Sequence, residues 1–236
     1  RILGTVPVEP DGSARFRLPA GKPVLFQALD ADGHAYQTMR TVTYVQPGEQ
    51  VSCVGCHDHR RSAPVRKTMD LAALGRAPSR IDPGELGGRP FSYVEVVQPL
   101  WDKHCVECHN ADRADGEIDL TGAPADSFTR SYVSLLSDVN FWHLGTNPEN
   151  AARALVPRFG GRNQIQVTAP GGAYGALGSR LMKLLRAGHE GVELTPSELR
   201  RVAAWIDLNA IFYGVNPARD QARQLHGEMV AMPEIQ

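Results

Sequence analysis

The sequence has little of what would point to a membrane or a nucleic acid. No apolar run approaches the roughly 20 residues that a helix needs to span a bilayer. Its 25 Lys and Arg residues are balanced by 26 Asp and Glu residues, so the formal net charge is -1 and no basic excess suggests a nucleic-acid surface. Hydrophobic residues make up 42% of the chain and charged residues 22%, as in ordinary globular proteins.

Cysteine is also scarce, and its placement is informative. The chain has four cysteines, and all of them lie in two short motifs, CVGCH at residues 53–57 and CVECH at residues 105–109. A disulfide scaffold would scatter its cysteines along the chain. The pairing therefore predicts a role for the thiols other than cross-linking.

Two familiar uses of such pairs fit poorly. Zinc sites built from two C-x-x-C pairs usually separate the pairs by roughly 15 to 20 residues, whereas Cys105 comes 49 residues after Cys56. Zinc also gives no reason for a histidine directly after each pair. A thioredoxin-like redox pair would need one C-x-x-C in a βαβ setting, which the sequence lacks.

C-x-x-C-H is instead the attachment signal of c-type haem. Two thioethers fix the porphyrin, and the next residue turns its imidazole to the iron as an axial ligand. We therefore predict two c-type haems, with zinc or redox chemistry as the alternatives. Because bacteria attach such haems outside the cytoplasm, we also predict a periplasmic or otherwise extracytoplasmic location. The predicted haem-binding residues are Cys53, Cys56, His57, Cys105, Cys108 and His109.

The hydrophobic pattern predicts an α+β chain with long loops. Residues 1–65 read as a small β-rich module, because SARFRLP at 13–19 alternates and residues 22–45 read as two strands around the Asp-Gly turn at 32–33. Residues 66–90 are rich in Pro, Gly and Arg and are predicted to connect this module to the rest. Residues 91–236 read as a mainly α-helical domain.

Three helices are expected most firmly in that domain. One precedes Cys105 and, because Pro99 lies inside the run, is either kinked or begins late. Another covers 178–189, with Leu181, Leu184 and Leu185 on one face and a C-terminal cap at Gly188. A third follows a capping box of Thr195 and Glu198. Its predicted buried stripe is Leu199, Val202, Trp205 and Ile206.

These segments resemble a known family. GTVPVEPDGSARF through CVGCH, residues 4–57, resembles the middle domain of the hydrazine synthase alpha subunit and its relatives in Planctomycetes. FSYVEVVQPLWDKHCVECHN, GEIDLTG and LTPSELRRVAAWIDLN are similar to the C-terminal cytochrome c domain of the same proteins. The resemblance implies a dihaem cytochrome c architecture in which a β-propeller commonly precedes this region. With the start at RILGTVPVEPDG, it leads us to expect a piece of a longer or processed protein.

The resemblance also implies different duties for the two haems. In hydrazine synthase the middle-domain haem is catalytic, its iron is bound by a Tyr four residues after the motif histidine, and that histidine binds zinc. The C-terminal haem has two histidine ligands and passes electrons. Here Arg61 occupies the tyrosine position, so we expect His57 to be an ordinary axial ligand.

The other histidines compete for the remaining axial positions. At the second haem we predict His189, in the segment that resembles the cytochrome c domain. At the first haem His143, Met39 and an open position all remain possible. We expect His34 to be a solvated loop residue and His104, directly before Cys105, to lie beside the haem or be exposed. Trp101, Trp142 and Trp205 are expected to pack in the core or against haem.

These patterns predict a dihaem c-type cytochrome that transfers electrons within or to a larger extracytoplasmic complex. The alternative is a catalytic multihaem subunit, hydrazine synthase-like, whose open first haem acts on small nitrogen or oxygen compounds. The electron-transfer reading is preferred, and an enzyme would be a haem-dependent oxidoreductase. A redox partner protein or a membrane-associated or periplasmic complex is the expected partner.

Overall fold

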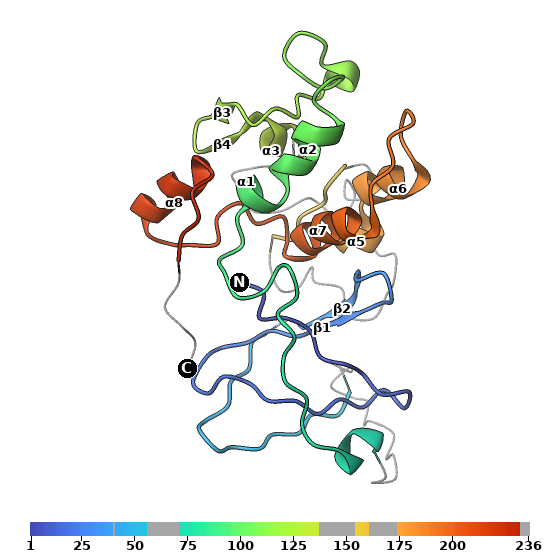
Figure 1. Ribbon diagram of the computed structural model, residues 1–236, viewed down its shortest axis with the longest axis vertical. Coiled ribbons are helices and arrows are strands. Elements are labelled where there is room, and N and C mark those ends of the chain that lie inside the picture. The colour runs from blue at the N-terminus through green and yellow to red at the C-terminus, as the bar shows by residue number, and fades with distance from the viewer. Residues whose placement is uncertain (40, 56–70, 137–153, 161–173, 232–236) are drawn as a thin grey trace. The chain divides into compact units, whose positions relative to one another are not determined.

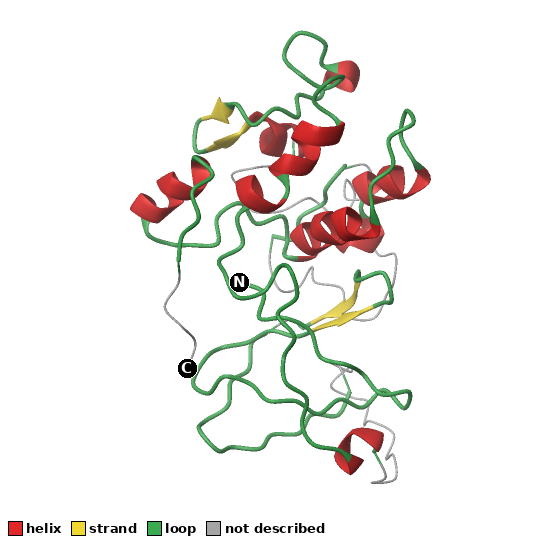
Figure 2. Ribbon diagram, in the orientation of Figure 1, coloured by secondary structure: helices red, strands yellow, loops and turns green. Residues whose placement is uncertain are grey.

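The computed structural model describes residues 1–39, 41–55, 71–136, 154–160 and 174–231. Short strands, several helices and long loops make up the chain, so the predicted α+β class is confirmed (Figures 1 and 2). The chain divides into two compact units. The first comprises Arg1–Leu25, Thr41–Pro90 and Ala231–Gln236, and the second comprises Phe26–Arg40 and Phe91–Val230.

Among the described residues of the first unit, single β-bridges are present and sheets are not. Thr5 and Asp82 exchange two backbone hydrogen bonds, of 2.8 and 2.9 Å. The predicted strand at 13–19 is wrong, because within it only Phe16 forms a bridge, with Ser79. The physical reason lies in the partner segment 71–90, whose prolines have no N–H to donate and whose glycines weaken a ladder.

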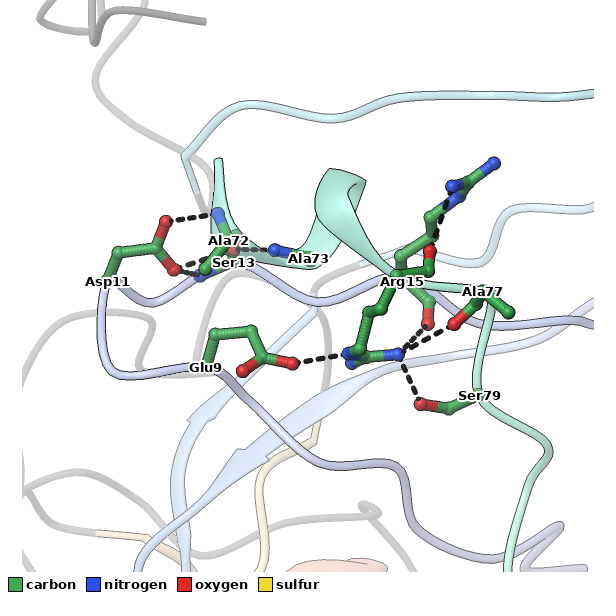
Figure 3. Close-up of polar contacts among 9 residues, drawn as sticks. Glu9, Asp11, Ser13, Arg15, Ala72, Ala73, Ala77 and Ser79 are labelled. Carbon is green, nitrogen blue, oxygen red and sulfur yellow. Dashed lines mark hydrogen bonds and ion pairs between the residues drawn. The ribbon is translucent and has the colours of Figure 1, made fainter. Parts of the chain in front are cut away.

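Polar side chains fasten residues 71–79 to the N-terminal loops (Figure 3). The Arg76 guanidinium donates to Glu9 Oε1 at 2.5 Å and to Ser79 Oγ at 2.7 Å. Asp11 Oδ2 accepts the N–H of Ala72 at 2.9 Å. That contact satisfies one of the unpaired donors at the start of the 3-10 helix Ala72–Gly75. These hydrogen bonds join segments that have no strand ladder between them.

The predicted hairpin is present, although it is short. Strand β1 (Gln27–Leu29) pairs antiparallel with β2 (Ala35–Thr38) around the turn at 32–33. By its contacts the hairpin belongs to the second unit, and residues 71–90 belong to the first. The two compact units have other bounds than the predicted domains 1–65, 66–90 and 91–236. The domain boundaries themselves stay a prediction.

The second unit carries the helices (Figure 1). No helix in the described ranges combines the length and apolarity that crossing a membrane requires. The elements that follow the hairpin are α1 (Tyr93–Val96), α2 (Gln98–His104), the 3-10 turn Asp115–Glu117, β3 (Pro124–Ala125), β4 (Phe128–Thr129), α3 (Arg130–Leu135), α5 (Gly175–Gly178), α6 (Arg180–Ala187), α7 (Pro196–Asp207) and α8 (Ala218–Leu225).

The three expected helices form largely as the sequence predicts. Pro99 lies in the first turn of α2, and the helical run is interrupted at Val97, so the predicted disruption near Pro99 is confirmed. Helix α7 begins with the predicted capping box. Helix α6 is capped by Gly188 at φ 79°, but its predicted face was partly wrong. The buried face of α6 consists of Leu181, Met182 and Leu185. Leu184 is 42% exposed, because around the helix it lies on the opposite side of Leu181 from Met182.

Aromatic side chains form the core of the second unit. Trp101 and Trp205 are buried, which confirms them as core residues, and Trp142 lies outside the described residues. The Trp101 indole donates to the Tyr93 hydroxyl at 2.9 Å, and that hydroxyl donates to Ser131 Oγ at 3.0 Å. The Trp101 indole and the Tyr93 hydroxyl therefore each have a hydrogen-bond partner inside this core.

Asp207 is a buried carboxyl at the end of α7. Its Oδ1 accepts the N–H of Ala176 at 2.7 Å, and its Oδ2 accepts the N–H of Ala35 at 2.8 Å. One side chain thus ties α5 and the hairpin to α7. Burial raises the pKa of Asp207 to about 6, although both hydrogen bonds act in the opposite direction.

We predict that Asp207 makes the second unit less stable as the pH rises from about 4 to about 6. In that window the folded chain keeps a proton that the unfolded chain has lost. The free energy of unfolding of the wild type, minus that of Asp207→Asn, should fall by on the order of 2 kcal/mol between pH 4 and pH 7.

Denaturant titrations followed by tryptophan fluorescence measure this difference, because all three tryptophans lie in 91–236. Asp112→Asn, at an exposed site, is the control; a difference independent of pH would contradict the prediction.

Candidate functional site

The second cysteine motif continues the last turn of α2. The N–H of Cys105 donates to the Trp101 carbonyl at 2.8 Å, and the N–H of His109 donates to the Cys105 carbonyl at 2.9 Å. The motif is therefore wound as a helical turn. Residues three and four apart lie on the same side of such a turn, so Cys105, Cys108 and His109 share one face. The spacing C-x-x-C-H thus places two thiols and an imidazole together.

Both thiols of this motif are free and only partly exposed. The pKa of Cys105 is raised to about 11, chiefly by burial and to a smaller extent by the neighbouring Cys108. Near neutral pH the Cys105 side chain is therefore a thiol and not a thiolate. Zinc would have to displace that proton. The described ranges contain no group of three or more His, Cys, Asp or Glu side chains arranged to hold a metal ion.

His109 and His189 come together although 80 residues separate them in the sequence. Their ring centres are 6.1 Å apart and their planes differ by 24°. The Nδ1 atom of His109 is buried and has no hydrogen-bond partner among the described residues. His189 is exposed, and only its backbone is engaged in hydrogen bonds in this part of the chain.

A tight turn between α6 and α7 presents His189. The N–H of Val192 donates to the His189 carbonyl at 2.8 Å, and the two residues form an isolated bridge. Gly188 and Gly191 have positive φ, of 79° and 78°, which glycine adopts without strain. The turn therefore fixes the backbone position of His189, while its imidazole ring is exposed.

The distance between the two ring centres equals that expected for two imidazoles bound to one metal atom. Metal–imidazole bonds of about 2 Å, extended from each nitrogen to its ring centre, put two axial imidazoles about 6 Å apart. Cys105 and Cys108 supply thiols on the face that carries His109. These residues therefore fit a covalently held haem with an imidazole on either side of its iron.

The first motif is described only in part. Cys53 is exposed and free. The Met39 sulfur accepts the N–H of Phe26 at 3.3 Å, at the end of the hairpin. The ligands of a first haem therefore stay predictions. Outside the described residues lie Cys56, His57, His59, Arg61 and His143.

His34 is not the solvated loop residue that the sequence suggested. It is 3% exposed, and its Nδ1 lies 3.2 Å from Asp30 Oδ1. The turn packs on α7, where a Cβ on Gly33 would meet Arg200 at 3.2 Å. The contact between the hairpin and α7 therefore buries the His34 ring, which its place in a turn had led us to expect in solvent.

Glu198 has a second role that the sequence did not reveal. Besides capping α7, its Oε1 lies 2.8 Å from Lys103 Nζ and 3.0 Å from His104 Nε2. Hydrogen bonds with Lys103 first, and then with His104, hold the pKa of Glu198 well below its ordinary value. The capping box was a local signal, whereas partners 94 and 95 residues away left no sequence signal.

The comparisons with known proteins include a match to a family model and a similar solved structure. Residues 1–58 match the family model described as the hydrazine synthase alpha subunit middle domain. A solved structure titled Kuenenia stuttgartiensis Hydrazine Synthase is 20% identical, with a TM-score of 0.42, over 83% of the present chain and 31% of that chain. The present chain thus spans about a third of that protein. No curated protein matches.

The family match covers the first motif and the loops that lead to it. The likeness of residues 91–236 to a cytochrome c domain is not covered by it and stays a prediction. The predicted resemblance to the hydrazine synthase alpha subunit family is confirmed over residues 1–58, which are similar to its middle domain.

Proposed function

We propose that the chain carries two c-type haems and forms part of a hydrazine synthase-like multihaem oxidoreductase acting on small nitrogen or oxygen compounds. The match of residues 1–58 supports this catalytic alternative better than a free-standing electron-transfer cytochrome. Because Arg61 occupies the position of the family's tyrosine ligand, the proposal extends to this class of substrates and not to hydrazine formation.

The observation that carries the haem-binding part of the proposal is the 6.1 Å spacing of the His109 and His189 rings beside two free thiols. A c-type haem bound there would supply an iron that accepts and releases single electrons. Cys105 and Cys108 would hold its edge, and His109 and His189 would occupy both axial positions. Since no axial position would be left for a substrate, this site is the electron-transfer site of the proposed enzyme.

The first motif would then hold the reactive haem. Cys53 and Cys56 would attach it and His57 would bind its iron. The catalytic proposal requires the opposite axial position to be open, and His143 or Met39 bound there would convert the site to electron transfer. The partner in this proposal is a redox protein or a larger complex, and its compartment is the periplasm or another extracytoplasmic space, because c-type haems are attached there.

We predict that each cysteine pair carries one haem. Replacing Cys105 and Cys108 together with Ala should lower the covalent haem content from two to one per chain, and so should replacing Cys53 and Cys56. The haem absorbance of the denatured protein, with its intact mass, measures this content. Ser52→Ala and Ser134→Ala are controls that should keep both haems. A wild type with bound zinc and no haem would contradict the proposal and support the zinc alternative.

We predict that the oxidised protein shows one high-spin and one low-spin haem in its EPR spectrum. The low-spin signal should come from the second site, so His189→Ala should convert it to high spin and let that haem bind carbon monoxide. His226→Ala, at an exposed histidine after α8, is the matched control. Two low-spin signals in the wild type would contradict the open first site and return the chain to an electron relay.

A further inference from the structure

The carboxylate of Glu198 is shared between two segments. Its Oε2 accepts the N–H and the hydroxyl of Thr195, at 2.8 and 2.9 Å, which closes the first turn of α7. Its Oε1 faces Lys103 Nζ at 2.8 Å and His104 Nε2 at 3.0 Å, at the end of α2. An ordinary helix cap uses only the first of these contacts. The second joins the beginning of α7 to the end of α2.

Both ends of this link are close in the sequence to the paired histidines. On the α2 side, His104 directly precedes Cys105, whose carbonyl accepts the His109 N–H. On the α7 side, Thr195 follows three residues after Val192, which is paired with His189. A shift of α7 relative to α2 would therefore move one ring relative to the other. Glu198 opposes that shift, because it contacts both His104 and Thr195.

The contact with His104 is the better protected half of the link. The side chains of Glu198 and His104 are 10% and 18% exposed, whereas that of Lys103 is 63% exposed. Ion pairs at exposed sites contribute little, because solvent screens the charges and ordering a long side chain costs entropy. A hydrogen bond to a carboxylate is stronger where solvent is excluded. The link should therefore depend on His104 more than on Lys103.

We propose that Glu198 is a positioning residue for the second haem, which acts through His104 to set the separation of His109 and His189. This inference rests on the proposed function, since it takes both histidines as axial ligands. Glu198 itself would touch neither the haem nor its iron. Its effect would be to keep His189 bound and so to exclude other ligands from that position.

The test uses the haem-loaded protein and carbon monoxide as the competing ligand. Glu198→Gln and His104→Ala should each raise the carbon monoxide affinity of the second haem about tenfold, the usual effect of losing a hydrogen bond to a charged group. Lys103→Ala should raise it by less than about twofold. The carbon monoxide complex of His189→Ala defines full opening of the second site. EPR of the oxidised variants gives an independent measure of the low-spin fraction.

Thr195→Ala is the matched control for a purely structural role. It removes the capping hydroxyl but keeps the backbone N–H that donates to Glu198 Oε2. Its unfolding midpoint should fall, while its carbon monoxide affinity should stay that of the wild type. Glu198→Asp is a second variant, because it keeps the charge at the helix start and is too short to span both contacts. It should behave as Glu198→Gln does.

The outcomes separate the inference from the proposed function. If Glu198→Gln, Glu198→Asp and His104→Ala lose stability but keep the carbon monoxide affinity and low-spin fraction of the wild type, Glu198 is only a cap and the inference is overturned. The double variant Glu198→Gln, His104→Ala should equal the single ones, and additive effects would likewise overturn a link through His104. If the wild type itself lacks a low-spin second haem, the proposed function fails first.

Discussion

The approach of two imidazoles from distant parts of the chain is the constraint on which the second unit depends. His109 lies in a turn that extends α2, and His189 lies in a turn that extends α6, yet their rings are 6.1 Å apart. Neither turn is stable alone, because a few residues with their own hydrogen bonds cannot offset the entropy of ordering them. The packing of α2, α6 and α7 must therefore fix both. Tyr93 of α1 contributes to this packing, because its ring lies 5.0 Å from that of Trp205 in α7 and its hydroxyl accepts the indole N–H of Trp101 in α2.

Polar side chains then hold what the aromatic core cannot reach. Asp207 joins α5, α7 and the hairpin through two backbone N–H groups, and Glu198 joins α7 to α2. The first unit relies on the same means, with Arg76 and Asp11 bridging its loops in place of a sheet. Side-chain hydrogen bonds of this kind can hold a loop in a defined path where regular backbone ladders are missing.

The similarity to the hydrazine synthase alpha subunit middle domain and the paired histidines bear on different halves of the proposal. The family match covers residues 1–58, in which the first motif lies. The ring spacing concerns only the second motif and would hold for any dihaem protein of this kind. An enzyme with an open reactive site needs an electron port, and a six-coordinate haem with two histidines is suited to that task, because its coordination does not change as the iron is oxidised or reduced. The two observations therefore support the same proposal, in which the first motif would hold a reactive haem and the second an electron-transfer haem.

The sequence alone determined the local features. Two C-x-x-C-H motifs, the capping box of α7, the glycine that ends α6, the interruption near Pro99 and the hairpin turn at 32–33 each depend on residues close together in the chain. Tertiary structure decided the rest. The strand expected at 13–19 did not form, because its partner is rich in proline and glycine; His34 is buried by a neighbouring helix; and Glu198 gained partners 94 and 95 residues away. The physical reason is that spacing in the sequence fixes which side of a helix or turn a residue occupies, while the surface that meets it is chosen only when distant segments pack.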